Sequence, residues 1–198
     1  MILYNLLKIS SFIIFFIFLF FIYIFNKIDY SSITQYIKEN NNRKTIVAFY
    51  GHTSFLDGII LIYLVRKSNF MSFANIKYKK WYPKIIHKYF YFIDGNKNNK
   101  NSKKKYDYNK LAISIEGTRG KKDYLRSGFK YIAQNNNYDI VYAIINYKTL
   151  KLELSNKIEY DKIPKLTNDD LLEPLKQLIK NKIYAIFLLS CSDIQFKN

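Results

Sequence analysis

Cysteine is almost absent from this sequence, since Cys191 is the only one in 198 residues. A single cysteine excludes an intramolecular disulfide framework and gives no thiolate cluster for a metal. We therefore predict neither a metal site nor a bound cofactor. One unpaired thiol fits a domain on the reducing side of a membrane.

Acidic residues and arginine are also scarce. The sequence has 15 acidic against 32 basic residues, a net charge of +17, and only four of the basic residues are arginine. Such a charge is typical of proteins that bind nucleic acid or an anionic membrane. An excess of lysine and asparagine can also reflect a biased genome, so the charge alone identifies no partner. Arg119 and Arg126 lie close together in the sequence, and arginine is hard to replace where a planar group must bind a phosphate bidentately.

Charge is absent from residues 9–25, which are dominated by Phe and Ile. A helix over these 17 residues covers about 26 Å, slightly less than the hydrocarbon core of a bilayer. Lys8 and Lys27 flank it and can reach the two interfaces. No small-residue cleavage site follows, which argues against a secretory signal peptide. We predict a membrane anchor at 1–26, either a single span or a shallow re-entrant helix, and a folded domain at 27–198.

Basic residues gather just after this anchor, at Lys27, Lys38, Arg43 and Lys44. Positive charge in a short segment beside a membrane helix favours the cytoplasmic side. We therefore expect a membrane protein whose folded domain lies on the cytoplasmic side.

Short apolar runs alternate with helical patterns through the rest of the chain. The apolar runs predict strands at 45–50, 89–93, 111–115, 140–147 and 150–154, the last two joined by a tight turn. Helical patterns cover 53–66, 124–134 and 171–179, and a polar loop is expected at 96–105. Asp170 with Glu173 resembles a capping box for the last helix, with Pro174 near its start. The alternation predicts an α/β fold in which helices sandwich a mixed sheet.

A histidine and an aspartate follow the first predicted strand, in the block HTSFLD at 52–57. Thr53 or Ser54 can cap a helix that carries Asp57 on its first turn. A spacing of five does not align two side chains on one continuous helix, but His52, just before the helix, can point back across that turn. Asp57 then accepts a hydrogen bond from one ring nitrogen and leaves the other as a general base. We predict His52 and Asp57 as a catalytic pair.

A second block, EGTR, follows the strand predicted at 111–115. Gly117 lets backbone amides approach a ligand, and Thr118 adds a hydroxyl donor. Arg119 can bind a phosphate bidentately, and Glu116 can hold the loop or the arginine in place. We predict that these four residues bind substrate. Both blocks follow strand C-termini, where such sheets bind their ligands.

Together the two blocks, HxxxxD and EGTR, resemble the signature pair of the glycerophospholipid acyltransferases. Residues 126–133 resemble the basic-(Ser/Thr)-Gly-Phe segment of that family, and 140–147 resemble the strand of its fourth block. The resemblance implies a glycerol-3-phosphate acyltransferase-like fold. It also implies transfer of a fatty acyl group from acyl-CoA or acyl-carrier protein to a lysophospholipid such as 1-acyl-glycerol-3-phosphate, in phospholipid synthesis. His52 is then expected to deprotonate a glycerol hydroxyl, which attacks the acyl thioester directly, without an acyl-enzyme.

The sequence departs from the family pattern at three positions. Ile115 and Asp139 each stand where the family usually has proline, and Gly95 replaces an arginine that helps to bind the acceptor phosphate. Lys97 or Lys100 could substitute for that arginine, so the acceptor headgroup is left open. Two other functions stay open: a membrane-tethered basic protein that binds anionic lipid or nucleic acid, and an inactive acyltransferase relative. Because no nucleic-acid-binding motif occurs, we expect no nucleic-acid partner.

Cations and aromatic rings are mixed between residues 77 and 92. This mixture predicts either an interfacial segment that dips into lipid headgroups or an ordinary half-exposed helix. His87 lies in this segment and is expected at the surface, not as a second base.

Overall fold

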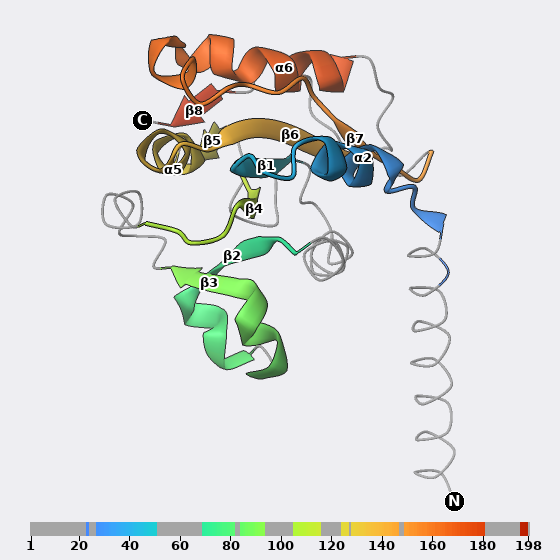
Figure 1. Cartoon of the computed structure of the whole chain (residues 1–198), viewed down its shortest axis with the longest axis vertical. Helices are drawn as coiled ribbons and strands as arrows, with labels where there is room; N and C mark the ends of the chain where they lie inside the picture. Colours follow the sequence, from blue (N-terminus) through green and yellow to red (C-terminus); the bar gives the residue numbers. More distant parts are fainter. Residues whose placement is uncertain are drawn as a thin grey trace, which may run out of the picture.

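A computed structural model gives the fold of the chain (Figure 1). It describes residues 23, 27–50, 69–81, 84–93, 105–115, 124–126, 128–146, 149–180 and 195–197. The strands of the main sheet are β1 (Thr45–Tyr50), β2 (Met71–Asn75), β3 (Phe90–Ile93), β4 (Lys110–Ser114), β6 (Asp139–Asn146) and β7 (Lys151–Leu154). Their order across the sheet is β3-β2-β4-β1-β6-β7. All neighbours pair in parallel except β6 and β7, so the sheet is mixed.

Strand β1 lies in the middle of the sheet, and all six of its residues are buried. Parallel strands that are covered on both faces have continuous apolar runs instead of alternating ones. This explains why the run TIVAFY predicts β1 correctly. The strands expected at 89–93, 111–115, 140–147 and 150–154 are confirmed as β3, β4, β6 and β7, within one residue at each end.

Helices cover both faces of the sheet. They are α2 (Ser31–Glu39), α5 (Gly128–Asn136) and α6 (Asn168–Lys180). Ile33 of α2 shares one buried cluster with Val47, whereas Leu171 of α6 shares a second cluster with Ile46. Neighbouring residues of a strand point to opposite faces, so β1 contributes to both layers. The predicted α/β architecture, a mixed sheet between helices, is confirmed.

The chain between β2 and β3 forms two short 3₁₀ helices, η1 (Ile76–Trp81) and η2 (Lys84–Tyr89). A third, η3 (Ile163–Lys165), precedes α6. Parallel neighbours such as β2 and β3 need a crossover of about a dozen residues or more, and η1 and η2 make this connection. The half-exposed helix allowed for this segment is therefore replaced by two short 3₁₀ helices.

The helix expected at 124–134 is wrong in its first part. Residues Tyr124–Arg126 form strand β5, which pairs in parallel with β8 (Gln195–Lys197), and α5 begins only at Gly128. This pairing joins segments that are far apart in the sequence. Tertiary contacts of this kind override local helix patterns, so the local sequence could not predict β5.

Helix α6 begins earlier than predicted, and its cap is different. The Thr167 hydroxyl accepts a hydrogen bond from the Asp170 N–H at 3.1 Å, and the Asp170 carboxylate accepts one from the Thr167 N–H at 3.1 Å. This reciprocal pair is the capping box, so the box predicted at Asp170 and Glu173 is wrong. Pro174 consequently lies inside the helix.

The predicted membrane anchor at 1–26 lies outside the described residues, except for Tyr23. Among the residues that the structure describes, no helix is both long and apolar enough to cross a membrane. The helix expected at 53–66 and nearly all of the loop expected at 96–105 also lie outside them.

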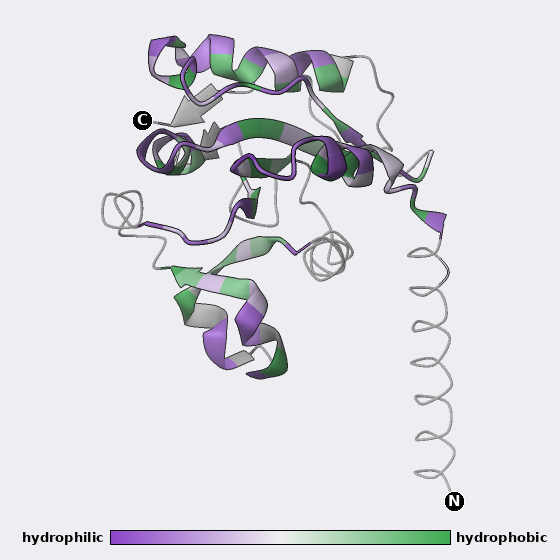
Figure 2. Ribbon diagram, in the orientation of Figure 1, coloured by the Kyte–Doolittle hydropathy of each residue, from purple (hydrophilic) through white to green (hydrophobic). Residues whose placement is uncertain are grey.

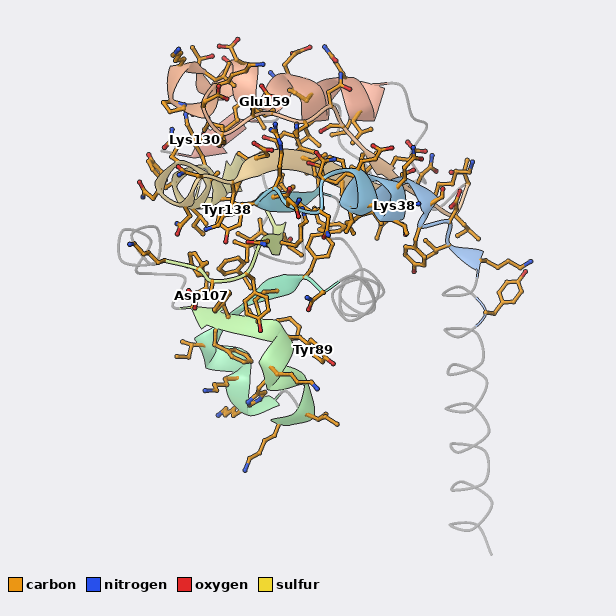
Figure 3. All side chains as sticks on the ribbon, in the orientation of Figure 1. Lys38, Tyr89, Asp107, Lys130, Tyr138 and Glu159 are labelled. Carbon is orange, nitrogen blue, oxygen red and sulfur yellow. The ribbon has the colours of Figure 1, made fainter. Side chains whose placement is uncertain are left out.

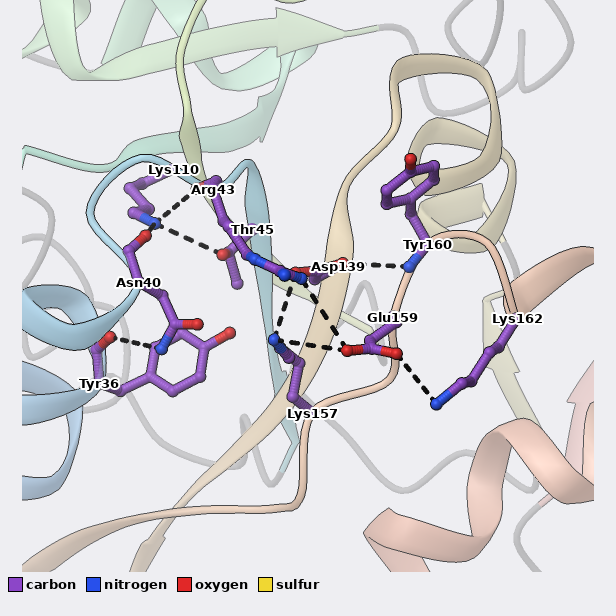
Figure 4. A network of polar contacts seen from close by, with 10 residues as sticks. All are labelled: Tyr36, Asn40, Arg43, Thr45, Lys110, Asp139, Lys157, Glu159, Tyr160 and Lys162. Atoms are coloured by element: carbon purple, nitrogen blue, oxygen red, sulfur yellow. Dashed lines mark hydrogen bonds and ion pairs between the residues drawn. The ribbon is translucent and has the colours of Figure 1, made fainter.

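A buried lysine connects three segments at the N-terminal edge of the sheet (Figure 4). Lys110, the first residue of β4, is only 6% exposed. Its ammonium donates to the carbonyls of Asn40 and Arg43, the latter at 2.6 Å, and to the Thr45 hydroxyl at 3.4 Å. Asn40 is the C-cap of α2, so the cation also lies at the negative end of that helix dipole. Burial lowers the pKa of Lys110, and the negative charge of Asp139 opposes this shift.

We predict that Lys110→Met lowers the free energy of unfolding by about 1–3 kcal/mol, because two backbone carbonyls lose their charged donor. The matched control is Lys165→Met, at an exposed position in η3. This substitution should change the free energy of unfolding by less than about 0.5 kcal/mol. Chemical denaturation of both variants in the same detergent, monitored by circular dichroism, measures the free energy of unfolding. Equally small effects would mean that solvent satisfies these carbonyls without Lys110.

Candidate functional site

The C-terminal ends of β1 and β4 lie side by side at one edge of the sheet. The two strands pair in parallel, with Phe49 opposite Ser114. The Ile115 N–H continues this ladder and donates to the Phe49 carbonyl at 3.1 Å. Adjacent strands are about 4.8 Å apart, so the chain leaves both strands from neighbouring points.

The predicted site residues all lie outside the described residues: His52, Asp57, Glu116, Gly117, Thr118 and Arg119. The structure does describe the residues that lead into both blocks. Tyr50 ends β1 two positions before His52, and Ile115 follows β4 directly before Glu116. The sequence predicted that each block follows a strand, and both strands are present. That the two strands are neighbours is a finding of the structure.

The connections from these two strands run in opposite directions across the sheet. From β1 the chain continues to β2, beyond β4, whereas from β4 it continues through α5 to β6, beyond β1. Right-handed crossovers that run in opposite directions cover opposite faces of a sheet. Neighbouring strands of this kind form the topological switch point at which open α/β sheets bind ligands.

Ser114, at the end of β4, has a buried hydroxyl oxygen without a hydrogen-bond partner among the described residues. Buried polar groups are usually paired, so this hydroxyl is available to a bound ligand or to the block that follows. Sequence reasoning missed Ser114. Its only signal was its position two residues before Glu116.

The N-terminal segment joins the domain at this same edge. Asp29 forms a parallel bridge to Lys151, in which its N–H donates to the Leu150 carbonyl at 2.7 Å and its carbonyl accepts from the Leu152 N–H at 3.0 Å. Lys151 lies opposite Asn146, the C-terminal residue of β6. The bridge is therefore three strand positions from β1, roughly 14 Å at the usual strand spacing.

A cluster of charged residues lies at the opposite, N-terminal edge (Figure 4). The buried carboxylate of Asp139 lies 3.5 Å from the Arg43 guanidinium and 3.8 Å from the Lys157 ammonium. Glu159 pairs with Lys162 at 2.9 Å, and this hydrogen bond lowers the pKa of Glu159. A buried charge needs such partners. Asp139, which stands where the family pattern has proline, thus has a structural role away from the predicted site.

His87 lies in η2 and is half-buried, so it is at the surface as expected. Its Nε2 is 3.2 Å from the Lys79 carbonyl, and its ring meets that of Phe92 edge-on at 5.1 Å. Both contacts hold η2 against its neighbours. They give His87 no place in a site at the ends of β1 and β4.

Within the described part of the chain, no three His, Cys, Asp or Glu side chains gather closely enough to hold a metal ion. Comparison with known proteins identifies no family: no family model, no curated protein and no solved structure matches the chain significantly. A functional assignment therefore depends on the two sequence blocks and on the strands that lead into them.

The β1–β4 ladder predicts the effect of restoring the family's proline. Ile115→Pro removes the N–H that bonds to Phe49, whereas Ile115→Val keeps it, and both replacements have three side-chain carbons. We expect Ile115→Pro to lower the free energy of unfolding by about 1–3 kcal/mol more than Ile115→Val. Parallel chemical denaturation curves measure the difference. If proline is tolerated as well as valine, the ladder ends before residue 115.

Proposed function

We propose that the protein is a membrane-bound O-acyltransferase of the glycerophospholipid acyltransferase type. It moves a fatty acyl group from acyl-CoA or acyl-carrier protein to a lysophospholipid such as 1-acyl-glycerol-3-phosphate. The observation that carries this proposal is that β1 and β4, which lead into the HxxxxD and EGTR blocks, are parallel neighbours.

Chain connectivity extends this observation to the two blocks. Tyr50 lies two residues before His52, and Ile115 lies one residue before Glu116. An extended chain spans about 3.5 Å per residue, so the two block residues start within roughly 7 Å and 4 Å of neighbouring strand ends. Arg119 lies four residues after Ile115, so it starts within roughly 14 Å of the end of β4. The side chains of His52 and Arg119 can reach one substrate from within these distances.

The reaction needs one base and no acyl-enzyme. His52, oriented by Asp57, takes the proton of the acceptor hydroxyl as its oxygen attacks the thioester carbonyl. The carbon–sulfur bond then breaks, and the departing thiolate takes a proton from the imidazolium, so the base is regenerated. Gly117, Thr118 and Arg119 hold the phosphate of the acceptor, with Arg119 as its bidentate donor, and Glu116 holds the loop or the arginine in place.

The attachment of the N-terminal segment supports a membrane-bound acceptor. Asp29 is bridged to β7 at the C-terminal edge of the parallel strands. An anchor at 1–26 would therefore join the domain on the side from which both blocks leave the sheet. A lysophospholipid could then present its headgroup to the site while its acyl chain stays in the bilayer.

The two histidines of the chain provide a matched test of the base. In membranes or nanodiscs that contain the full chain, His52→Ala should reduce acyl transfer by about 10²–10⁴-fold, because general-base catalysis is lost. His87→Ala changes the other histidine, which is placed in η2, and should retain near wild-type turnover. Radiolabelled acyl-CoA and acyl-carrier protein with a panel of lysophospholipids measure the activity and also identify the acceptor.

Two outcomes contradict this assignment. Full turnover by His52→Ala would remove the mechanism. Absence of turnover by the wild-type chain with every donor and acceptor would favour an inactive relative.

Arginine substitutions test the phosphate site separately. Arg119→Lys keeps the charge but loses the bidentate fork, so KM for a phosphate-bearing acceptor should rise by about 10–100-fold, the equivalent of one charge-assisted hydrogen bond. Arg43→Lys is the control, because Arg43 pairs with Asp139 at the other edge of the sheet. Steady-state kinetics at varied acceptor concentration measure KM for both variants. An equal rise of KM in Arg43→Lys would contradict the assignment of the phosphate site.

A further inference from the structure

Two aliphatic side chains are exposed on the 3₁₀ helices between β2 and β3. Ile85 in η2 is 75% exposed and Ile76 in η1 is 49% exposed. The other exposed large hydrophobic residues in the described part of the chain are tyrosines, whose hydroxyls can bond to water. The two isoleucines, in contrast, expose aliphatic surface that forms no hydrogen bond to water.

Exposed lysines accompany the isoleucines on both helices: Lys79 and Lys80 in η1, and Lys84 and Lys88 in η2. Residues 69–93 contain no acidic residue. Figure 2 shows hydrophobic and hydrophilic residues intermixed along these turns, and Figure 3 shows their side chains projecting outward beyond the labelled Tyr89. We call Ile76, Lys79, Lys80, Lys84, Ile85 and Lys88 the η surface.

The η surface is held against the sheet by Phe92 of β3. The Lys79 ammonium lies 5.5 Å from the centre of the Phe92 ring, and the His87 ring meets Phe92 edge-on at 5.1 Å. His87 also contacts the Lys79 carbonyl, which links η2 to η1. Because these contacts exist in the free protein, little ordering is needed when the surface binds a partner.

The chemistry of the η surface matches an anionic bilayer. Lysine ammonium groups are attracted to anionic headgroups, each by about fivefold in binding. Aliphatic side chains beside them can enter the boundary between headgroups and acyl chains. A nucleic acid would use the lysines but would leave both isoleucines in water. The isoleucines therefore favour a lipid surface.

The η surface and the N-terminal attachment lie at opposite ends of the sheet. β3 is one edge strand, and Asp29 is bridged to β7, the other (Figure 1). Ile76 directly follows Asn75, the last residue of β2, so η1 starts at the same C-terminal edge as the Asp29 bridge. The chain then crosses back, and η2 ends at Tyr89, directly before β3, at the N-terminal edge. The central strands β4 and β1 lie between these two points.

The structure points to a second membrane contact: the η surface is a peripheral docking site for a bilayer that contains anionic phospholipid. It is separate from the predicted anchor and does not depend on the acyl-transfer chemistry.

Fluorescence quenching in the full chain tests this proposal. In a Cys191→Ser background, Ile85→Cys is labelled with an environment-sensitive fluorophore, and the protein is reconstituted into vesicles that carry a spin-labelled lipid as quencher. Vesicles of phosphatidylcholine are compared with equal mixtures of phosphatidylcholine and phosphatidylglycerol. We expect severalfold stronger quenching in the mixture, and weaker quenching as salt is raised. Replacing Lys84 and Lys88 by Gln should lower the docked-to-undocked ratio roughly 25-fold, fivefold per lysine.

Matched positions elsewhere serve as controls. Tyr131→Cys in α5, whose native side chain is 51% exposed, should stay unquenched, and Lys105→Gln with Lys165→Gln should leave the signal at position 85 unchanged. Equal quenching at positions 85 and 131, or no dependence on phosphatidylglycerol, overturns the proposal. A response of the label to single-stranded RNA instead of vesicles also overturns it, in favour of a nucleic-acid surface. Acyl transfer is not part of the readout, so the result is independent of the proposed reaction.

Discussion

The parallel pairing of β1 with β4 is the constraint on which the candidate site depends. Residues of β1 alternate between two buried clusters, with Ile46 on the face of α6 and Val47 on the face of α2. A slip of one residue would exchange these faces, so helices on both sides hold the register. That register places Phe49 opposite Ser114 and thereby determines where the chain leaves each strand. The location of the site is thus a consequence of core packing on two faces.

The two edges of the sheet are built differently. At the N-terminal edge, the buried Lys110 binds backbone carbonyls and the buried Asp139 faces Arg43 and Lys157. Loss of one partner would leave a buried charge without compensation, which is strongly destabilising. At the C-terminal edge, the described end of β4 offers only the hydroxyl of Ser114 without a partner. Among the described residues, the buried ionic groups of the sheet therefore lie on the side away from the proposed chemistry.

The elements that were predicted correctly have a local signal, although α2 and β2 were not predicted. The run at 45–50 and the run at 140–147 are continuous because both faces of β1 and β6 are buried. Strand β5 could not be predicted, since its partner β8 is remote in the sequence. The capping box at Thr167 was missed because two overlapping patterns share Asp170. For the site, the two blocks predicted which residues take part and in which roles. The order of strands that makes β1 and β4 neighbours is a non-local property of the whole sheet, so the sequence did not predict it.

An acceptor that resides in a bilayer imposes a requirement on the position of the anchor. Residues 26 and 29 are three positions apart, so the proposed anchor would end no farther than roughly 10 Å from the Asp29 bridge. The bridge itself is roughly 14 Å from β1 along the C-terminal edge. Had the chain joined the N-terminal edge instead, the length of a six-residue strand such as β1, about 20 Å, would separate the anchor from the ends of the strands. The headgroup of a lysophospholipid would then have to leave the bilayer by that distance with its acyl chain exposed to water. Attachment at Asp29 would avoid this cost, which connects one backbone bridge on an edge strand to the proposed lipid acceptor.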